Sequence, residues 1–416
     1  MIKKKKIFAG CFWVCFTCLV FSCDNRKEAH PLHVIPVASA VGDYNILNLS
    51  EYATEIRYIP LETNDLALFG EIRFINYEDD KIFISDWKGG CHLFDNNGKF
   101  LCKIGQRGQG PDDYLYIFQS FMHDNLIYLN SINKLLIYNA NGRLVENIKL
   151  NPIEELPTEY YGGYILPLNK DTFVMDANTS TNVYYPKAIL FEKYQSKAKM
   201  IKLYKNDFKF KERTSIGLIE RAIMYRFNNE VRTYKYPNCD TIFTIGQDLE
   251  MKDAFIFELG NYRPPLSFFE EDTDIYLNFI HPANIFESHN HIFIEFSFGK
   301  HAPEPFEYIL IFGGSEVVGP RTNYNVLGVF DKRTGELKLM KQPVKGKLGF
   351  KNDIDNGPII WPHYISPNNE LVTYISVEDF MDYYEKIANP TPQMTEIAKS
   401  VNMDDNQIVI IAKLKE

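Results

Sequence analysis

The sequence predicts an all-β protein, a six-bladed β-propeller with an N-terminal closing strand and a small helical insertion in the last blade. Three observations support this prediction. Strand-turn-strand units recur, with Ile82 and Ile127 separated by 45 residues and Phe94 and Tyr138 by 44. Asn-Gly turns separate apolar runs, and 31 Phe and 26 Tyr favour strands over helices. A period in the forties is typical of propeller blades, and seven blades remain the alternative count.

The first unit occupies residues 81–104 and contains three predicted strands, at 82–85, 91–94 and 99–104. Asn97-Gly98 joins the last two, because both central residues of a type I′ hairpin turn require positive φ. This turn pairs Leu93 with Cys102 and Phe94 with Leu101, and it places Cys91 opposite Ile104. Cys91 and Cys102 are then diagonal neighbours, about 7–8 Å apart, which is too far for a disulfide. Both thiols are therefore predicted to be free.

The second unit follows at residues 126–148, and weaker copies complete the prediction. These copies are expected at 172–203, 230–259, 292–331 and 371–412. Two apolar segments, 44–49 and 55–61, come before the first unit. One of them is expected to close the ring by pairing with the last blade. The helical insertion is predicted within about 377–403, where apolar residues recur at three-to-four spacing.

The N-terminus has the pattern of a bacterial lipoprotein. Residues 1–22 are predicted to be a signal peptide, because the positive segment Lys3–Lys6 precedes a short apolar core at residues 7–21. Ser22 and Cys23 end that core and resemble a lipobox, which predicts lipidation of Cys23 and an outer-membrane location in the cell envelope. The leaflet stays open, and the alternative is an ordinary signal peptide with a chance cysteine. Residues 23–41 are predicted to be a flexible tether, and residues 42–416 the propeller.

Composition excludes some classes of partner. The formal net charge is −9 and the pI is about 5.6, which argue against a nucleic-acid-binding surface. A hydrophobic content of 45% is enough for a large core. Cys91, Cys102 and Cys239 follow the lipobox, and their odd number excludes a disulfide framework.

Four stretches resemble one family. They are residues 104–114, 238–243, 353–362 and 404–409. They are similar to lipid-anchored six-bladed β-propeller proteins of Bacteroidetes, whose shape is related to NHL and TolB-type propellers. This chain has Gly-Pro-Asp-Asp-Tyr at 110–114 where the family has Gly-Pro-Gly-Glu-Tyr. The resemblance implies an envelope protein, and some members are associated with glycan use.

The densest group of polar and aromatic residues is the candidate ligand site. Asp353 and Asp355 face one side of an extended segment, and Trp361 and His363 follow them closely. A tryptophan beside carboxylates suits the face of a sugar. The alternative is turn chemistry, in which the carboxylates bind their own backbone before Gly357-Pro358. Arg107 is a second candidate, as an anion contact within the glycine-rich corner of residues 105–110.

The sequence contains no catalytic or cofactor motif, and no metal site is predicted. His289 and His291 have no third ligand at matched spacing. The leading functional hypothesis is a lipid-anchored binding or interaction module for a glycan or an envelope protein. The rival hypothesis is a propeller enzyme of the lactonase, lyase or glycosidase type with a site at the central channel. Titratable groups from different blades that converge within hydrogen-bond reach would favour the enzyme.

Overall fold

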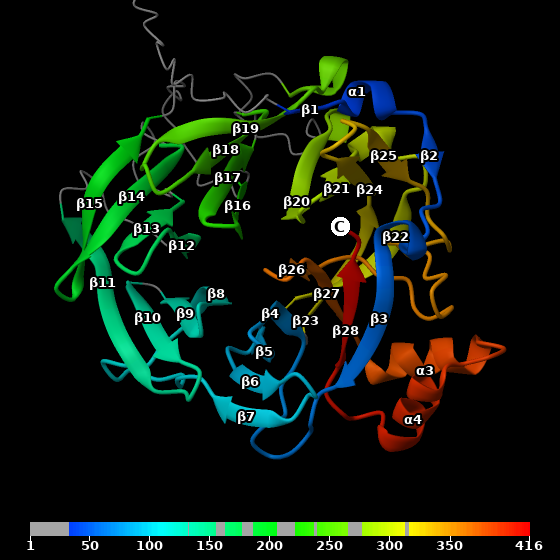
Figure 1. Ribbon diagram of the computed structural model, residues 1–416, viewed down its shortest axis with the longest axis horizontal. Helices are drawn as coiled ribbons and strands as arrows, with labels where there is room; N and C mark the ends of the chain where they lie inside the picture. Colours follow the sequence, from blue (N-terminus) through cyan, green and yellow to red (C-terminus); the bar gives the residue numbers. More distant parts are fainter. Residues whose placement is uncertain are drawn as a thin grey trace, which may run out of the picture. The chain divides into compact units, whose positions relative to one another are not determined.

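The computed structural model describes eight segments of the chain, and its strands succeed one another as a series of sheets (Figure 1). The segments are residues 33–131, 133–154, 163–176, 186–205, 221–236, 239–264, 277–312 and 316–416. Cys23 and the predicted signal peptide lie outside them. None of the described helices is long and apolar enough to cross a membrane.

The first sheet corresponds to the first predicted unit. Its strands are β4 (Ile72–Glu78), β5 (Lys81–Asp86), β6 (Cys91–Asp95) and β7 (Phe100–Lys103), paired in that order. The predicted pairing of Leu93 with Cys102 is confirmed, and Ile104 donates a backbone hydrogen bond to Cys91. The predicted pairing of Phe94 with Leu101 is wrong, because a register shift pairs Phe94 with Phe100. Cys91, Cys102 and Cys239 are free thiols, as predicted.

The next two units form one continuous sheet. Its strands are β8 (Ile117–His123), β9 (Leu126–Ser131), β10 (Lys134–Asn139), β11 (Leu144–Glu154), β12 (Ile165–Pro167), β13 (Thr172–Met175), β14 (Ala188–Tyr194) and β15 (Lys197–Tyr204). The outer strand β11 is 11 residues long and pairs in parallel with β15. Lys197 and Glu154 form an ion pair of 3.6 Å at this junction.

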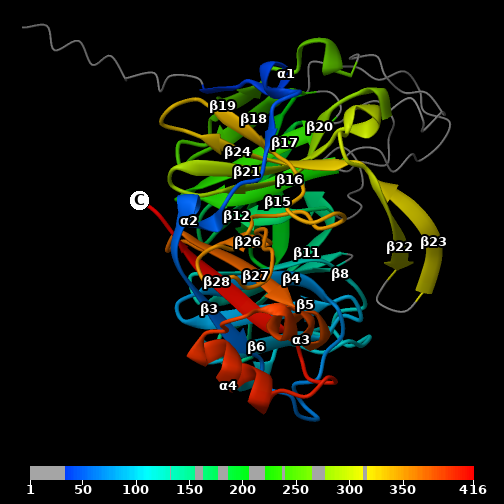
Figure 2. The same ribbon diagram turned by 90° about the vertical axis from the view of Figure 1, so that its right-hand side faces the viewer.

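Two further sheets each contain five strands, and a hairpin lies apart from them. The first has β16 (Arg221–Phe227), β17 (Glu230–Tyr236), β18 (Thr241–Ile245), β19 (Met251–Phe257) and β1 (His33–Ile35). The second has β20 (His281–Glu287), β21 (His291–Ser297), β24 (Asn325–Asp331), β25 (Leu337–Met340) and β2 (Tyr44–Asn45). The hairpin comprises β22 (Phe306–Phe312) and β23 (Glu316–Asn323), and it projects from the sheets (Figure 2).

The prediction of a six-bladed propeller is wrong. Six blades require six separate sheets, and the seven-bladed alternative requires one more. In the described part of the chain the strands form five sheets and the separate β22–β23 hairpin, because β11 joins two predicted units into one eight-stranded sheet. The arrangement is nevertheless all-β and propeller-like, since the innermost strands of neighbouring sheets contact one another. These contacts join β4 to β8, β12 to β16, and β16 to β20.

As predicted, a strand that precedes the first unit pairs with the last unit. β3 (Ala53–Pro60) pairs antiparallel with β28 (Ile408–Leu414), and it completes a four-stranded sheet with β26 (Tyr364–Ile365) and β27 (Glu370–Ile375). Between β27 and β28 lie α3 (Val377–Lys386) and α4 (Pro392–Ser400), within the interval predicted for the helical insertion. The side chains of Ser376 and Thr391 cap the first turns of α3 and α4.

The last residues of the predicted tether, 33–41, are part of the fold, whereas residues 23–32 lie outside the described segments. β1 pairs in parallel with β19, and α1 (Val37–Ala40) follows it directly, before α2 (Leu49–Tyr52). Ile35 and Val37 are fully buried in a core that also contains Phe257. Residues 33–41 therefore belong to the fold, since α1 also contacts β25 and the 3₁₀ helix η1 (Gly260–Tyr262). A second 3₁₀ helix, η3 (Gly299–His301), follows β21.

Candidate functional site

A cavity of about 780 Å³ lies among the innermost strands of the sheets. Its walls come from β4, β8, β12, β16 and β20, together with the segment from His363 to Asn369. Distant parts of the chain therefore meet around one space. The volume falls within the range of about 300–1,000 Å³ that is usual for small-molecule sites.

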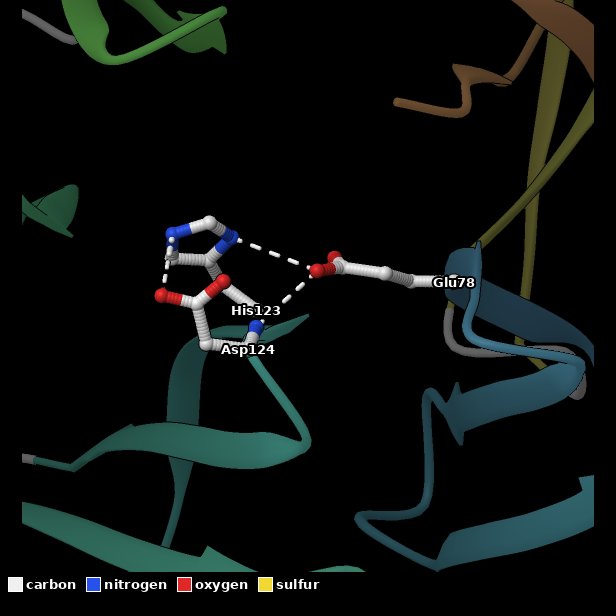
Figure 3. Close-up of side chains that lie close together, drawn as sticks. All are labelled: Glu78, His123 and Asp124. Carbon is white, nitrogen blue, oxygen red and sulfur yellow. Dashed lines mark hydrogen bonds and ion pairs between the residues drawn. The ribbon is translucent and has the colours of Figure 1, made fainter. Parts of the chain in front are cut away.

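Glu78, His123 and Asp124 converge at this cavity (Figure 3). The His123 Nδ1 atom lies 3.4 Å from Glu78 Oε1, and Nε2 lies 3.3 Å from Asp124 Oδ2. The backbone N–H of Asp124 donates to Glu78 Oε1 at 2.9 Å. One imidazole and two carboxylates thus lie within 4.8 Å of one another. This arrangement can hold a metal ion or exchange a proton with a ligand.

Equivalent tight turns bring these residues together. Glu78 ends β4 and His123 ends β8, and each strand is followed by two residues with positive φ. These residues are Asp79 (50°) and Asp80 (56°) in the first turn, and Asp124 (51°) and Asn125 (57°) in the second. Because β4 contacts β8, the two turns lie next to each other, and Asn125 Nδ2 donates to Asp79 Oδ2 at 2.7 Å.

Glu78 is only partly satisfied by hydrogen bonds. The residue is 8% exposed, and its Oε2 atom is buried without a hydrogen-bond partner in the described segments. Arg226 of β16 is the neighbouring cation. Burial lowers the pKa of Arg226, and the nearby Asp124 and Glu78 carboxylates oppose this shift. Its guanidinium donates to the carbonyls of Pro167 and Asn228. These bonds leave the second oxygen of Glu78 available to a ligand.

Other carboxylates of the cavity are neutralised by close ion pairs. Glu287 Oε2 lies 3.1 Å from Arg232 Nε, and Glu287 Oε1 lies 3.1 Å from Lys332 Nζ. Asp176 Oδ1 lies 3.2 Å from Lys235 Nζ, with both side chains buried. Such pairs are structural, because a buried charge without a partner is costly.

Tyrosines supply much of the remaining polar surface. Burial raises the pKa of Tyr364, and the nearby Glu78 raises it further. Burial also raises the pKa of Tyr374 to about 12, and its hydroxyl donates to the Ile72 carbonyl at 3.2 Å. Tyr225 faces Glu287, and burial raises its pKa well above the usual value. These phenols are neutral donors at any physiological pH.

Of the ligand-binding residues predicted from sequence, His363 lines the cavity. Its Nδ1 atom lies 2.8 Å from Thr373 Oγ1, and its ring lies 4.7 Å from that of Tyr374. Desolvation lowers the pKa of His363, although the residue is exposed where it lines the cavity. Asp353, Asp355, Trp361 and Arg107 are not among the lining residues.

The carboxylates of the two predicted aspartates are engaged in structural hydrogen bonds. Asp353 accepts from the backbone N–H and the hydroxyl of Ser50, at 2.9 and 2.6 Å, in the first turn of α2. Asp355 accepts from Gly357 N at 2.9 Å and from Asn352 Nδ2 at 2.7 Å. The Asp355 bond to Gly357 is the turn chemistry that the sequence offered as the alternative.

Trp361 and Arg107 lie elsewhere on the fold. Trp361 packs against Phe293 and Phe350, with ring centroids 5.8 and 5.3 Å apart. Arg107 is exposed in the glycine-rich corner, where its backbone forms an isolated parallel β-bridge with that of Tyr114. In that corner Asp113 accepts from Gly110 N at 2.9 Å, which fixes the turn.

His289 and His291 have different surroundings, and neither belongs to a group of three possible metal ligands in the described segments. His289 lies in the turn before β21 and lines the cavity. His291 begins β21, is buried, and lies 3.7 Å from Asp331. Burial lowers the pKa of His291 below its usual value.

Sequence reasoning missed the Glu78–His123–Asp124 cluster. Its members come from two units, and no local motif joins them. One signal was present in the sequence. Glu78 and His123 are 45 residues apart, which is the spacing of Ile82 and Ile127. Polar residues at equivalent positions of neighbouring repeats meet in space when the repeats pack side by side.

These features define an all-β, propeller-like protein with a polar central cavity. The chain belongs to the family defined by the domain of unknown function DUF4934, whose model matches residues 32–413. No curated protein matches the chain.

Two solved structures from Bacteroides share the fold. A Bacteroides fragilis protein described as exported aligns with a TM-score of 0.64 and 18% identity, covering 92% of this chain and 100% of its own. A DUF4221 family member from Bacteroides vulgatus aligns with a TM-score of 0.50 and 13% identity, covering 88% and 98%. At these identities the similarity concerns the fold alone.

Proposed function

We propose that this protein is a lipid-anchored binding module of the cell envelope that takes a polar ligand, with a glycan as the first candidate, into the central cavity. The observation that carries this proposal is the cavity of about 780 Å³ itself, where carboxylates, imidazoles and phenols stand beside aromatic rings. Sugars present hydroxyl groups at the edge and an apolar face, so they match polar groups next to rings such as Tyr364 and Phe227.

The envelope location rests on separate support. The Bacteroides fragilis structure of similar fold is described as an exported protein, which favours export of this chain as well. The apolar segment at residues 7–21 and the Ser22-Cys23 pair favour a lipoprotein of the outer membrane.

A glycan array with the purified full chain tests the ligand class, and a cavity-filling variant tests the location. Ala283 lines the cavity at a register shift in β20. Ala283→Trp should reduce affinity for a captured glycan about tenfold or more, with an unchanged melting temperature. Ala283→Ser is the matched control and should bind like the wild type. Equal affinity of a folded Ala283→Trp variant would contradict binding in the cavity.

A second candidate function is an enzyme of the lactonase, lyase or glycosidase type. The specific observation in its favour is the 3.4 Å approach of His123 to Glu78, since the two side chains come from different sheets. A carboxylate and an imidazole at this distance suit general acid–base chemistry. Turnover of a captured ligand that Glu78→Gln abolishes, with binding retained, would select the enzyme over the binding module.

A further inference from the structure

We propose that Glu78, His123 and Asp124 form a binding site for a divalent transition-metal ion of the zinc class. The site lies at the junction of β4 and β8, on the wall of the cavity. It goes beyond the proposed function, because an ion can be bound whether or not the cavity also takes a glycan.

The distance between two of the donor atoms fits a tetrahedral site. In a tetrahedral site with bonds of about 2.0–2.1 Å, neighbouring ligand atoms are about 3.3 Å apart. The distance from His123 Nδ1 to Glu78 Oε1 is 3.4 Å, so this pair already has the length of one tetrahedral edge. The Asp124 side chain is 78% exposed, so it can rotate to bring its oxygen to the same ion. Glu78 and His123 are thus preorganised, and Asp124 closes the site.

One carboxylate oxygen of Glu78 is buried without a partner among the described residues. Glu78 is more than nine-tenths buried, its carboxylate points toward His123 (Figure 3), and Oε2 has no hydrogen-bond partner in the described segments. Leaving a buried carboxylate oxygen unpaired costs free energy, which a cation bound by both oxygens of Glu78 would recover.

The buried carboxylates of Glu287 and Asp176 at the cavity differ from that of Glu78. Glu287 and Asp176 each have a lysine or arginine nitrogen within 3.2 Å. Glu78 Oε1 lies 3.4 Å from the His123 imidazole, and the nearby Arg226 donates its hydrogen bonds to the backbone carbonyls of Pro167 and Asn228. The cluster therefore has a vacancy for positive charge that the other acidic positions lack.

The donor set selects the class of ion. One imidazole nitrogen and two carboxylates suit zinc and its neighbours among the transition metals. Calcium prefers six to eight oxygen ligands, and magnesium keeps most of its water, so neither ion matches three protein ligands that include histidine. Three protein ligands leave at least one coordination position open toward the cavity, as in zinc sites that bind water or a substrate oxygen.

The experiment uses the full chain, purified in mild detergent and stripped of metal with a chelator. Calorimetric titration with Zn²⁺ alone should give one site per chain, and Ca²⁺ should bind far more weakly. Co²⁺ should give visible absorption bands without the intense charge-transfer band of thiolate ligands. The charge-transfer band distinguishes the proposed site from metal binding by cysteine, because Cys91, Cys102 and Cys239 are free thiols.

Glu78→Gln and His123→Gln each remove one donor with little change in size, and each should weaken Zn²⁺ binding about tenfold or more. Asp65→Asn, at an exposed carboxylate outside the cluster, is the matched control and should bind like the wild type. Melting temperatures without metal verify that each variant is folded. The proposal is overturned if the wild type binds no Zn²⁺, or if both folded variants retain wild-type affinity.

Discussion

His92 makes the stability of the fold depend on pH. It lies in β6, is 2% exposed, and its ring centroid is 5.4 Å from that of Phe69 and 6.3 Å from that of Phe100. Neither ring nitrogen has a hydrogen-bond partner among the described residues. The closest carboxylate, Asp86, accepts instead from the backbone N–H groups of Gly90 and Gly70. Burial lowers the pKa of His92 to about 4.

The direction of the pH effect follows from the protonation of His92 in the folded and in the unfolded chain. At pH above 6.5 the imidazole is neutral in both states and contributes nothing to pH dependence. As the pH falls below 6.5, the unfolded chain takes up a proton that folded His92 does not, so the free energy of unfolding decreases. The decrease is complete below the folded pKa of about 4. The two pKa values correspond to a total loss of about 3 kcal/mol.

Urea unfolding of the wild type and of His92→Phe at pH 7.5 and pH 4.5 measures this loss. Phenylalanine keeps an apolar ring in the same place and cannot take up a proton. Between these two pH values the wild type should lose about 2 kcal/mol more than the variant. The comparison with the variant matters because burial lowers the pKa of His291 and His363 as well. Equal losses in the two proteins would refute the reasoning.

Two further predictions concern the anchor and a tight turn. Cys23→Ala should move the protein from the membrane fraction to the soluble fraction, and an unchanged distribution would count against lipidation. Gly98→Ala should destabilise the fold by more than about 2 kcal/mol, because its φ is +82° and the new Cβ would lie 2.1 Å from the Pro60 carbonyl oxygen. Gly335→Ala, at φ +75° with no atom within 4 Å, should cost only about 1 kcal/mol and isolates the effect of the collision with Pro60.

The sequence predicted features that depend on neighbouring residues. The partner predicted for Cys102 was correct, although the predicted type I′ turn was wrong, because Gly98 has positive φ and Asn97 does not, and the Gly98 N–H donates to the Asp95 carbonyl. The free state of Cys91 and Cys102 followed from that register. The pairing of Phe94 failed, since a bulge next to the turn adds a residue that no local pattern indicates.

Features that depend on distant segments were harder to predict. The parallel pairing of β11 with β15 joins two sheets through outer edges, and alternation of apolar residues does not indicate which edges meet. β1 is three residues long, so its apolar pattern is indistinguishable from that of a tether. Asp353 and Asp355 resembled a binding pair, but hydrogen bonds to Ser50 and Gly357 occupy their carboxylates.

A comparison of the strand ends at the cavity explains why the candidate metal site lies between β4 and β8. Glu78, His123 and Glu287 each end the innermost strand of a unit, so the fold presents all three at the cavity. At Glu287, Arg232 and Lys332 neutralise the carboxylate within the fold. At Glu78 the neighbouring unit supplies a histidine instead. An imidazole can donate its lone pair to an ion, whereas a protonated arginine or lysine cannot. A metal ion beside Glu287 would therefore be unfavourable, because Arg232 already lies there. At the β4–β8 junction, in contrast, the imidazole of His123 and the carboxylate of Glu78 can both act as ligands.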